Sequence, residues 1–270
     1  MTPSSSRWQI TPDADNAQAA AILSQDPVWN SFALADLEPP LRDYCQFAVA
    51  AQDDSHERAI CLILRHPIIG QVLSPFGSVA GVAAILAHVA LPERPLIQAQ
   101  ELHAPLLRRY YRAETTWRSM LRMAITGASW RSVPAAPPHP VVRLTASDVP
   151  ALTDLHRRDP ESAFSAELFS RALCFGVYAG DRLIAAGGTH ALDPAHGIAV
   201  LGNIFTAPEA RNQGYATAIT TALVATLLGQ NVSLVVLNVF ADNSPAIRIY
   251  QRLGFQTRHH LVTGRATLSP

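Results

Sequence analysis

The stretch Phe205-Thr-Ala-Pro-Glu-Ala-Arg-Asn-Gln-Gly-Tyr-Ala-Thr217 carries the most information about how this chain folds. It follows an apolar, strand-like run and leads into a predicted helix that starts near Gly214. The first N–H groups of a helix have no partner inside the helix, and the helix dipole adds positive potential to them. Because Gly214 lacks a Cβ and Ala216 is small, phosphate oxygens can approach this backbone closely. The stretch therefore predicts a strand, an anion-binding loop suited to a diphosphate, and a helix, with Arg211 adding positive charge.

A second pattern lies about one helix and one strand downstream, Leu237-x-Val239-x-x-x-Asn243-x-x-Ala246-x-x-x-Tyr250-x-x-x-Gly254-Phe255. The first pattern alone, Arg-x-x-Gly-x-Ala, is also compatible with an ordinary helix start. It lacks the Gly-Lys-Ser/Thr of a mononucleotide phosphate loop and the Gly-x-Gly-x-x-Gly of a dinucleotide fold, which disfavours both kinds of site. The two patterns together are much more specific than either one.

Turn signals and apolar spacing predict alternating strands and helices around these motifs. Thr145-Ala-Ser-Asp148 offers a helix N-cap, and Gly180-Asp181 is a hairpin turn signal. The expected helices are Val149–His156, Ala166–Leu173, Gly214–Leu228 and Ser244–Leu253. The expected strands are Phe175–Ala179, Leu183–Thr189, Ile198–Thr206, Val232–Phe240 and Gln256–Thr263. This order predicts an α/β fold in which a mixed sheet carries helices on both faces.

Four prolines in Val133-Pro-Ala-Ala-Pro-Pro-His-Pro140 mark the clearest break in the chain. Proline cannot donate to a helix or to a central sheet ladder, so we expect an exposed loop or an extended linker there. The predicted domains are accordingly residues 1–132 and residues 141–270, joined by the proline-rich segment 133–140.

The first half of the chain repeats part of this order. Its expected strands are Ile68–Leu73, Pro95–Ala99 and Trp117–Ile125, and its expected helices are Gly77–Leu91 and Ala104–Tyr111. Pro105-Leu-Leu-Arg-Arg-Tyr110 parallels Pro245-Ala-Ile-Arg-Ile-Tyr250, which indicates either an internal duplication or a chance match between two α/β segments. The segment Gly77-Ser-Val-Ala-Gly81 lacks the Arg and Gln that precede Gly214.

Together the two motifs resemble the GNAT superfamily of N-acyltransferases, and the resemblance covers Val141 to Phe255. It implies a mixed α/β sheet that splays open between the strand ending at Thr206 and the strand ending near Asn238. The pantetheine arm of CoA would lie in that splay, with acetyl-CoA as the co-substrate. By the same resemblance, residues 1–132 are a degenerate GNAT-like copy or an accessory domain.

The resemblance also implies which residues bind the cofactor. The backbone of Ile204, Phe205 and Thr206 would hydrogen-bond the pantetheine arm like an added strand. Asn243 would cap the next helix and contact the arm. The diphosphate would rest on backbone N–H groups of one continuous segment, which comprises Arg211, Asn212, Gln213, Gly214, Tyr215, Ala216 and Thr217.

Tyr250 is the catalytic residue that the resemblance implies, because it would point at the thioester sulfur and protonate the leaving thiolate. A phenol suits this role since it stays protonated at neutral pH, and the alternative is an aromatic packing residue. Many relatives place a carboxylate base on the strand read here as Ile198–Thr206, but this strand has none. His190, Asp193 and His196 flank the preceding hairpin and are the nearby candidate bases. A histidine suits the role by its pKa, and His190 is the one assigned here; the alternative is an exposed hairpin histidine.

The predicted activity is transfer of an acetyl or other acyl group from acyl-CoA to a primary amine of a small molecule or peptide, by direct attack. The alternative is a CoA-binding sensor or scaffold without turnover, which the missing strand carboxylate favours.

Lys plus Arg equals Asp plus Glu at 21 each, so no global charge attracts nucleic acid or an anionic membrane. The three cysteines show neither metal-ligand nor disulfide spacing, and we see no signal peptide. The sequence therefore predicts a cytoplasmic enzyme without a metal.

Overall fold

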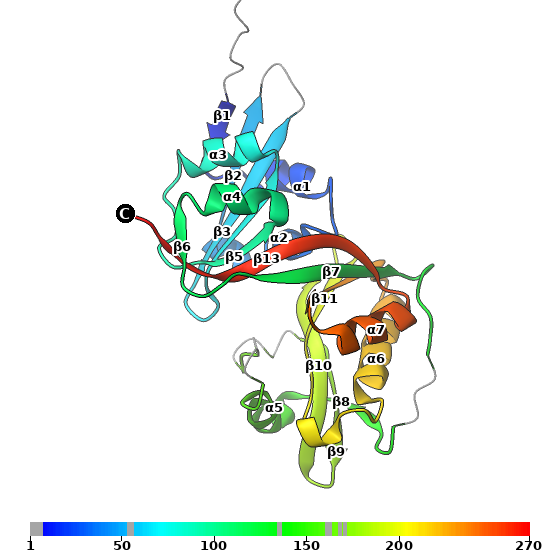
Figure 1. The fold of residues 1–270 in the computed structure, drawn as a ribbon. Coiled ribbons are helices and arrows are strands. Elements are labelled where there is room, and N and C mark those ends of the chain that lie inside the picture. Colours follow the sequence, from blue (N-terminus) through cyan, green and yellow to red (C-terminus); the bar gives the residue numbers. More distant parts are fainter. Residues whose placement is uncertain (1–7, 53–56, 134–136, 160–163, 167–168, 170–171) are drawn as a thin grey trace, which may run out of the picture. The chain divides into compact units, whose positions relative to one another are not determined.

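The computed structural model describes residues 8–52, 57–133, 137–159, 164–166, 169 and 172–270. Over these residues the chain forms thirteen strands and seven α-helices in a mixed α/β fold, as the sequence predicts (Figure 1). Two compact units are present: unit 1 contains Met1–Leu121 with His259–Pro270, and unit 2 contains Arg122–Arg258. The expected helix Ala166–Leu173 includes residues outside the described ranges, namely 167–168 and 170–171.

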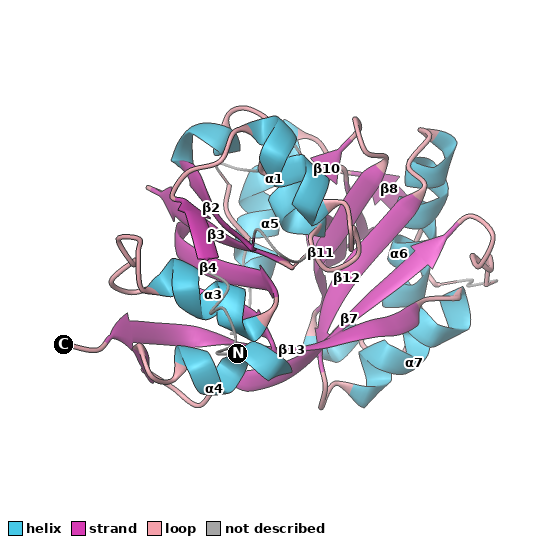
Figure 2. Cartoon of the chain, turned by 90° about the horizontal axis from the view of Figure 1, so that it is seen from above, coloured by secondary structure: helices cyan, strands magenta, loops and turns pink. Residues whose placement is uncertain are grey.

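Unit 2 contains a mixed sheet with helices on both faces. Its first four strands are antiparallel to one another, namely β8 (Val141–Arg143), β9 (Cys174–Ala179), β10 (Arg182–Asp193) and β11 (Ile198–Thr206). A crossover through α6 (Tyr215–Gly229) then places β12 (Leu234–Phe240) parallel to β11. Helix α5 (Val149–His156) covers one face, whereas α6 and α7 (Ser244–Leu253) cover the other (Figure 1 and Figure 2).

Local signals explain several element ends in unit 2, and the predicted bounds of α5, β11 and α7 are confirmed. Helix α7 starts after Asn243, whose side chain accepts a hydrogen bond from the Ala246 N–H at 3.2 Å. It ends at Gly254, whose φ of 102° is a left-handed conformation that favours glycine. Before α5, a capping box is built on Thr145. At the β9–β10 turn, Gly180 has a φ of 60°, as its hairpin signal predicts.

Unit 1 repeats this order of elements. Its antiparallel strands are β1 (Trp8–Thr11), β2 (Cys45–Gln52), β3 (Arg58–His66) and β4 (Gly70–Gly77), and helices α1 (Asn16–Leu23) and α2 (Ser31–Ala35) lie between β1 and β2. Helix α3 (Val79–Leu86) leads to β5 (Leu96–Gln100), which is parallel to β4. Helix α4 (Ala104–Leu107) follows β5 as α7 follows β12, and both helices carry proline in their first turn. The recurring order supports duplication over a chance match.

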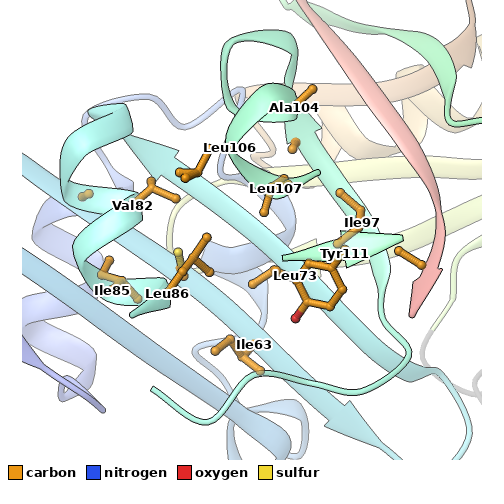
Figure 3. Close-up of a cluster of buried hydrophobic side chains, with 14 of the residues drawn as sticks. Ile63, Leu73, Val82, Ile85, Leu86, Ile97, Ala104, Leu106, Leu107 and Tyr111 are labelled. Carbon is orange, nitrogen blue, oxygen red and sulfur yellow. The ribbon is translucent and has the colours of Figure 1, made fainter. Parts of the chain in front are cut away.

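The core of unit 1 lies between its helices and its strands. Val82 and Ile85 of α3 and Leu107 of α4 pack with Leu73 and Ile97 of the sheet (Figure 3). All five side chains are completely buried. Burying an aliphatic side chain of this size stabilises a fold by about 1.5–3 kcal/mol. Apolar burial of this kind is the main force that holds the unit together.

The chain distributes its last strands between the two units. β7 (Arg118–Thr126) begins in unit 1 and ends in unit 2, whereas β13 (Gln256–Leu268) begins in unit 2 and ends in unit 1. In unit 1, β13 pairs with β5 and with the short strand β6 (Tyr111–Ala113). These limits differ from the expected 1–132 and 141–270, because strand pairing can join segments far apart in the sequence. The described part of the proline-rich segment belongs to unit 2.

Three predicted elements of the first half are wrong in their bounds. Residues 68–69 lie in a turn, and β4 continues to Gly77 because it pairs with β3 over its whole length. Helix α3 stops at Leu86 instead of Leu91, and α4 stops at Leu107, after which Tyr111 pairs with β13. Apolar spacing identified these elements, but tertiary pairing set their ends. Among the described helices, none is both long enough and apolar enough to cross a membrane.

Candidate active site

Strands β11 and β12 separate partway along their length. Their parallel pairing runs from Ile198↔Leu234 to Leu201↔Leu237 and continues no further, although every residue of both strands is described. On its other side, β11 stays paired with β10 as far as Thr206. Residues 202–206 therefore present an edge to which an extended ligand arm can add as a strand. Three predicted backbone contacts lie on this edge, namely Ile204, Phe205 and Thr206.

The loop between β11 and α6 leaves a run of backbone N–H groups without acceptors. The first hydrogen bond at the start of α6 runs from the Ala218 N–H to the Gly214 carbonyl at 3.0 Å. None of the N–H groups from Asn212 to Thr217 has an acceptor in the part of the chain that the structure describes. Asn212 and Gly214 have positive φ values of 64° and 83°, as in backbone nests that bind anions. A Cβ on Gly214 would meet no atom within 4 Å, so the space beside it is open.

Arg211 and Glu209 fix the start of this loop. Glu209 accepts a hydrogen bond from Arg158 at 2.6 Å and pairs with Arg182 at 3.0 Å. The hydrogen bond from Arg158 is the main cause that lowers the pKa of Glu209 to about 2, so the carboxylate stays ionised. Arg211 Nε donates to the Thr206 carbonyl at 3.3 Å, which places its guanidinium beside the end of β11. The loop therefore has a cation next to its open N–H groups.

Tyr215 turns its side chain into unit 2 and away from the open side of the loop. It is 1% exposed, and its hydroxyl donates to Gln213 Oε1 at 3.2 Å. Nδ1 of His139 lies 2.7 Å from the same hydroxyl. Ala216 is half-buried and Thr217 is buried. The residues from Tyr215 to Thr217 therefore offer a ligand their backbone N–H groups more than their side chains.

Tyr250 lies near the end of α7, which packs against α6. Its ring makes an edge contact with Phe255 at 5.8 Å between centroids, and the residue is 7% exposed. Burial raises the pKa of Tyr250 to about 12. Within the described residues no group hydrogen-bonds its hydroxyl. The side chain therefore combines a packed ring with a protonated hydroxyl that none of the described groups engages.

His190 and Asn203 are bulge residues on neighbouring strands. Thr189↔Leu201 and Ala191↔Val200 are paired, which leaves His190 as an extra residue of β10. Asn203 of β11 has a φ of 52°, and a side-chain hydrogen bond joins it to His190. A Cβ built on Gly202 would lie 2.3 Å from the His190 ring, so that ring lies directly against Gly202.

His190 lies at the point where β11 and β12 separate. Its ring lies against Gly202, which directly follows Leu201, the last residue of β11 that pairs with β12. His190 keeps solvent access, yet the protein around the imidazole desolvates it and lowers its pKa, an effect that the Asn203 hydrogen bond opposes. Because the ordinary pKa of histidine is ~6.5, the ring is neutral at pH 7 and can accept a proton.

His156, the last residue of α5, lies near His190. It is 5% exposed and stacks on Phe164 at 4.9 Å between ring centroids, and its Nδ1 has no hydrogen-bond partner among the described residues. Burial lowers its pKa to about 4, Asp159 opposes this shift, and the charge of His190 adds to it. His156 is therefore neutral at pH 7 and puts no positive charge beside His190.

Comparison with known families agrees with this geometry. The model of the Acetyltransferase (GNAT) family matches residues 142–255, which include β11, the open loop, α6, β12 and α7. Residues 142–255 form a GNAT domain. The match supports acyl transfer as the general activity of the chain. No curated protein matches the sequence.

Three solved structures resemble nearly the whole chain. A GNAT-family protein from Novosphingobium aromaticivorans is 21% identical, with a TM-score of 0.62 over 92% of this chain and 99% of that one. A GCN5-related N-acetyltransferase from Sphaerobacter thermophilus is 16% identical, with a TM-score of 0.64 over 99% and 97%. A tandem GNAT protein from the clavulanic acid biosynthesis pathway is 13% identical, with a TM-score of 0.56 over 98% and 99%. These likenesses establish the fold and fit a tandem GNAT layout.

The GNAT domain brings the predicted cofactor residues onto one strand edge and the loop that follows it, while Asn243 and Tyr250 lie on the next helix. Three residues of the site were missed from the sequence, namely Asn203, His139 and His156. Asn203 carries a local signal, because asparagine is enriched at positive φ. The two histidines carry none, since tertiary packing alone brings them to Tyr215 and His190.

Proposed function

We propose that the GNAT domain transfers an acetyl group, or another acyl group, from acyl-CoA to a primary amine. The observation that carries the proposal is the run of N–H groups from Asn212 to Thr217 without acceptors, next to the unpaired edge of β11. A diphosphate at a helix N-terminus satisfies such groups, and the dipole of α6 favours its charge. The neighbouring edge suits the amide-bearing pantetheine arm, with Asn243 at the entry to α7.

His190 is the proposed general base. A protonated amine has no lone pair for attack, so it must first lose a proton. The neutral imidazole accepts that proton, and the amine nitrogen attacks the thioester carbonyl carbon. The C–S bond breaks as the thiolate leaves with its electron pair, and the second proton lost by the nitrogen passes through water to the thiolate. A base on β10 fits the absence of a carboxylate on β11, because Gly202 has no side chain and the His190 ring occupies that space.

Tyr250 is proposed to stabilise the departing thiolate. At a pKa of about 12 the phenol remains protonated at neutral pH. Complete proton transfer from such a phenol to a thiolate whose conjugate acid has a pKa near ~8.5 is uphill. The expected role of Tyr250 is therefore a hydrogen bond to the sulfur, with the final proton taken from water.

The remaining proposals concern the partner and the compartment. The acceptor is a small-molecule or peptide amine. In the described residues, no group of three or more His, Cys, Asp or Glu side chains gathers as a metal site would require, and direct attack needs no metal. Cys45, Cys61 and Cys174 are free and buried, which suits a reducing, cytoplasmic compartment.

The test combines two measurements on the full chain. Calorimetric titration with acetyl-CoA measures binding, and release of free CoA thiol over a panel of amino acids, small amines and peptides measures turnover. Saturable binding with amine-dependent thiol release supports the proposal. Binding without release for any amine favours the CoA-binding sensor or scaffold, and absence of binding contradicts both functions.

A further inference from the structure

The proline-rich segment contributes a side chain to the open loop. His139 stands between Pro138 and Pro140, just before β8, and β8 packs against α6 (Figure 1). Proline fixes its own φ and restricts the residue that precedes it, so the backbone around His139 has little freedom. The imidazole is therefore presented to α6 with little loss of conformational entropy on folding.

A chain of hydrogen bonds leads from His139 into the loop. Nδ1 of His139 lies 2.7 Å from the Tyr215 hydroxyl, which donates its single proton to Gln213 Oε1 at 3.2 Å. The phenol oxygen must then accept the Nδ1–H of His139. The two rings lie 6.2 Å apart between centroids. Because Tyr215 is 1% exposed, water cannot easily replace these bonds.

The anchored residue controls the direction of the N–H groups. Tyr215 is the first residue of α6 and directly follows Gly214, the left-handed N-cap. Asn212 is also left-handed, and the backbone N–H groups between it and Thr217 make no bonds of their own that would hold the loop. The bond between the side chains of Gln213 and Tyr215 thus helps to hold this backbone in place, and His139 adds a further bond to it.

We propose that His139 is a positioning residue, which acts through Tyr215 and Gln213 to hold residues 212–217 in the shape that receives the diphosphate of acyl-CoA. This inference rests on the proposed function, because it takes acyl-CoA as the ligand of the loop. It also assigns the proline-rich segment a role in the GNAT domain beyond connecting two halves of the chain.

The experiment compares four variants of the full chain. His139→Ala and Tyr215→Phe each remove the anchoring bond, and Tyr215→Phe keeps the ring packing. His139→Asn places a side-chain N–H at the position of Nδ1 and should restore the bond. Tyr178→Phe is the matched control, because Tyr178 donates an equally short hydrogen bond of 2.7 Å to Asp148 elsewhere in the same unit.

Two readouts separate this inference from the proposed function. Hydrogen exchange of the free protein should be faster at the start of α6, where the Ala218 N–H makes the first helical hydrogen bond, in both His139→Ala and Tyr215→Phe. The Kd for acetyl-CoA should rise about three- to tenfold in both variants, the equivalent of one net hydrogen bond. The double variant should lose no more affinity than either single one, because the two residues form one interaction.

Rescue by His139→Asn and wild-type behaviour of Tyr178→Phe support the inference. Unchanged exchange at the start of α6, or an unchanged Kd in both His139→Ala and Tyr215→Phe, overturns it while the proposed function stands. If wild-type protein binds no acetyl-CoA, the proposed function fails, and the assigned role of His139 in cofactor binding fails with it.

Discussion

The β4–α3 connection of unit 1 and the β11–α6 connection of unit 2 occupy the same place in the repeated order of elements. They differ in whether their backbone N–H groups are free to bind a ligand. In unit 1 one residue, Ser78, separates β4 from α3, whereas in unit 2 eight residues, 207–214, separate β11 from α6. Ser78 Oγ accepts the Gly81 N–H at 3.1 Å. A Cβ on Gly81 would lie 2.7 Å from that of Ala59, so the turn is packed against the sheet.

The difference shows how one supersecondary unit either closes or opens an anion site. A capping side chain satisfies donors of the helix from within, and a tightly packed glycine leaves no space for a ligand. In unit 2 the N-cap is Gly214, which has no side chain to cap with, and the space beside it is empty. The longer loop also adds Asn212 and Gln213 to the run of open N–H groups. We therefore expect a single acyl-CoA site per chain, in unit 2.

The largest expected effect comes from closing the open loop. Gly214→Glu places a carboxylate where the diphosphate should lie, so acetyl-CoA binding should be abolished. Calorimetry should give one site per wild-type chain and none for the variant. Gly180→Glu is the matched control, because Gly180 also has positive φ and open space beside it but lies in the β9–β10 turn. A stoichiometry near two, or unchanged affinity in folded Gly214→Glu, would falsify the contrast between the units.

The next largest effect should follow removal of His190, the proposed base, which lies at a bulge of β10 in unit 2. His190→Gln should lower kcat by about 10²–10⁴-fold, with little change in acetyl-CoA affinity. Because the pKa of His190 is lowered, kcat/KM of the wild type should fall on the acid side only below pH ~6.5, and this limb should vanish in the variant. A pH profile that keeps the limb, or a loss that follows His196→Gln instead, would contradict the assignment.

A smaller effect is expected at Tyr250. Tyr250→Phe keeps the ring contact with Phe255 and removes only the hydroxyl. One hydrogen bond to a developing charge is worth about 1.5–3 kcal/mol, so kcat should fall roughly 10–100-fold while the Kd for acetyl-CoA stays the same. Steady-state kinetics with the true acceptor measure this. Full kcat from neutral to alkaline pH would make Tyr250 a packing residue.

The smallest effect should come from the closed turn of unit 1. Ser78→Ala removes the N-cap of α3 and should lower the free energy of unfolding by ~1 kcal/mol in denaturant titration. Acetyl-CoA affinity should not change, because this turn is expected to bind no cofactor. A change in affinity or stoichiometry would show that the two connections share a function after all.

The sequence predicts the elements of unit 2 better than those of unit 1, because in unit 2 the residues that mark the ends of an element lie close to that element. In unit 2, Asn243, Pro245 and Gly254 mark both ends of α7 within one short segment. In unit 1, β1, β2, β3, α1 and α2 were not predicted, although β2 and β3 are antiparallel partners that cover residues 45–52 and 58–66. Both strands are buried on both faces for most of their length, so they lack the alternation that marks a strand.

The sequence by itself determined the α/β class, the helices on either side of β12 and the open loop. The loop was expected to open at Arg211 but opens at Asn212, because the Arg211 N–H donates to the Pro208 carbonyl at 3.3 Å. These features depend on glycines, caps and apolar spacing within a few residues, so they can be read locally. Only the tertiary structure decided that β13 completes unit 1, that His190 lies against Gly202, and that His139 reaches Tyr215 across 76 positions. Such contacts form because strand pairing and packing bring distant segments together, and the local sequence around one residue of a distant pair does not identify the other.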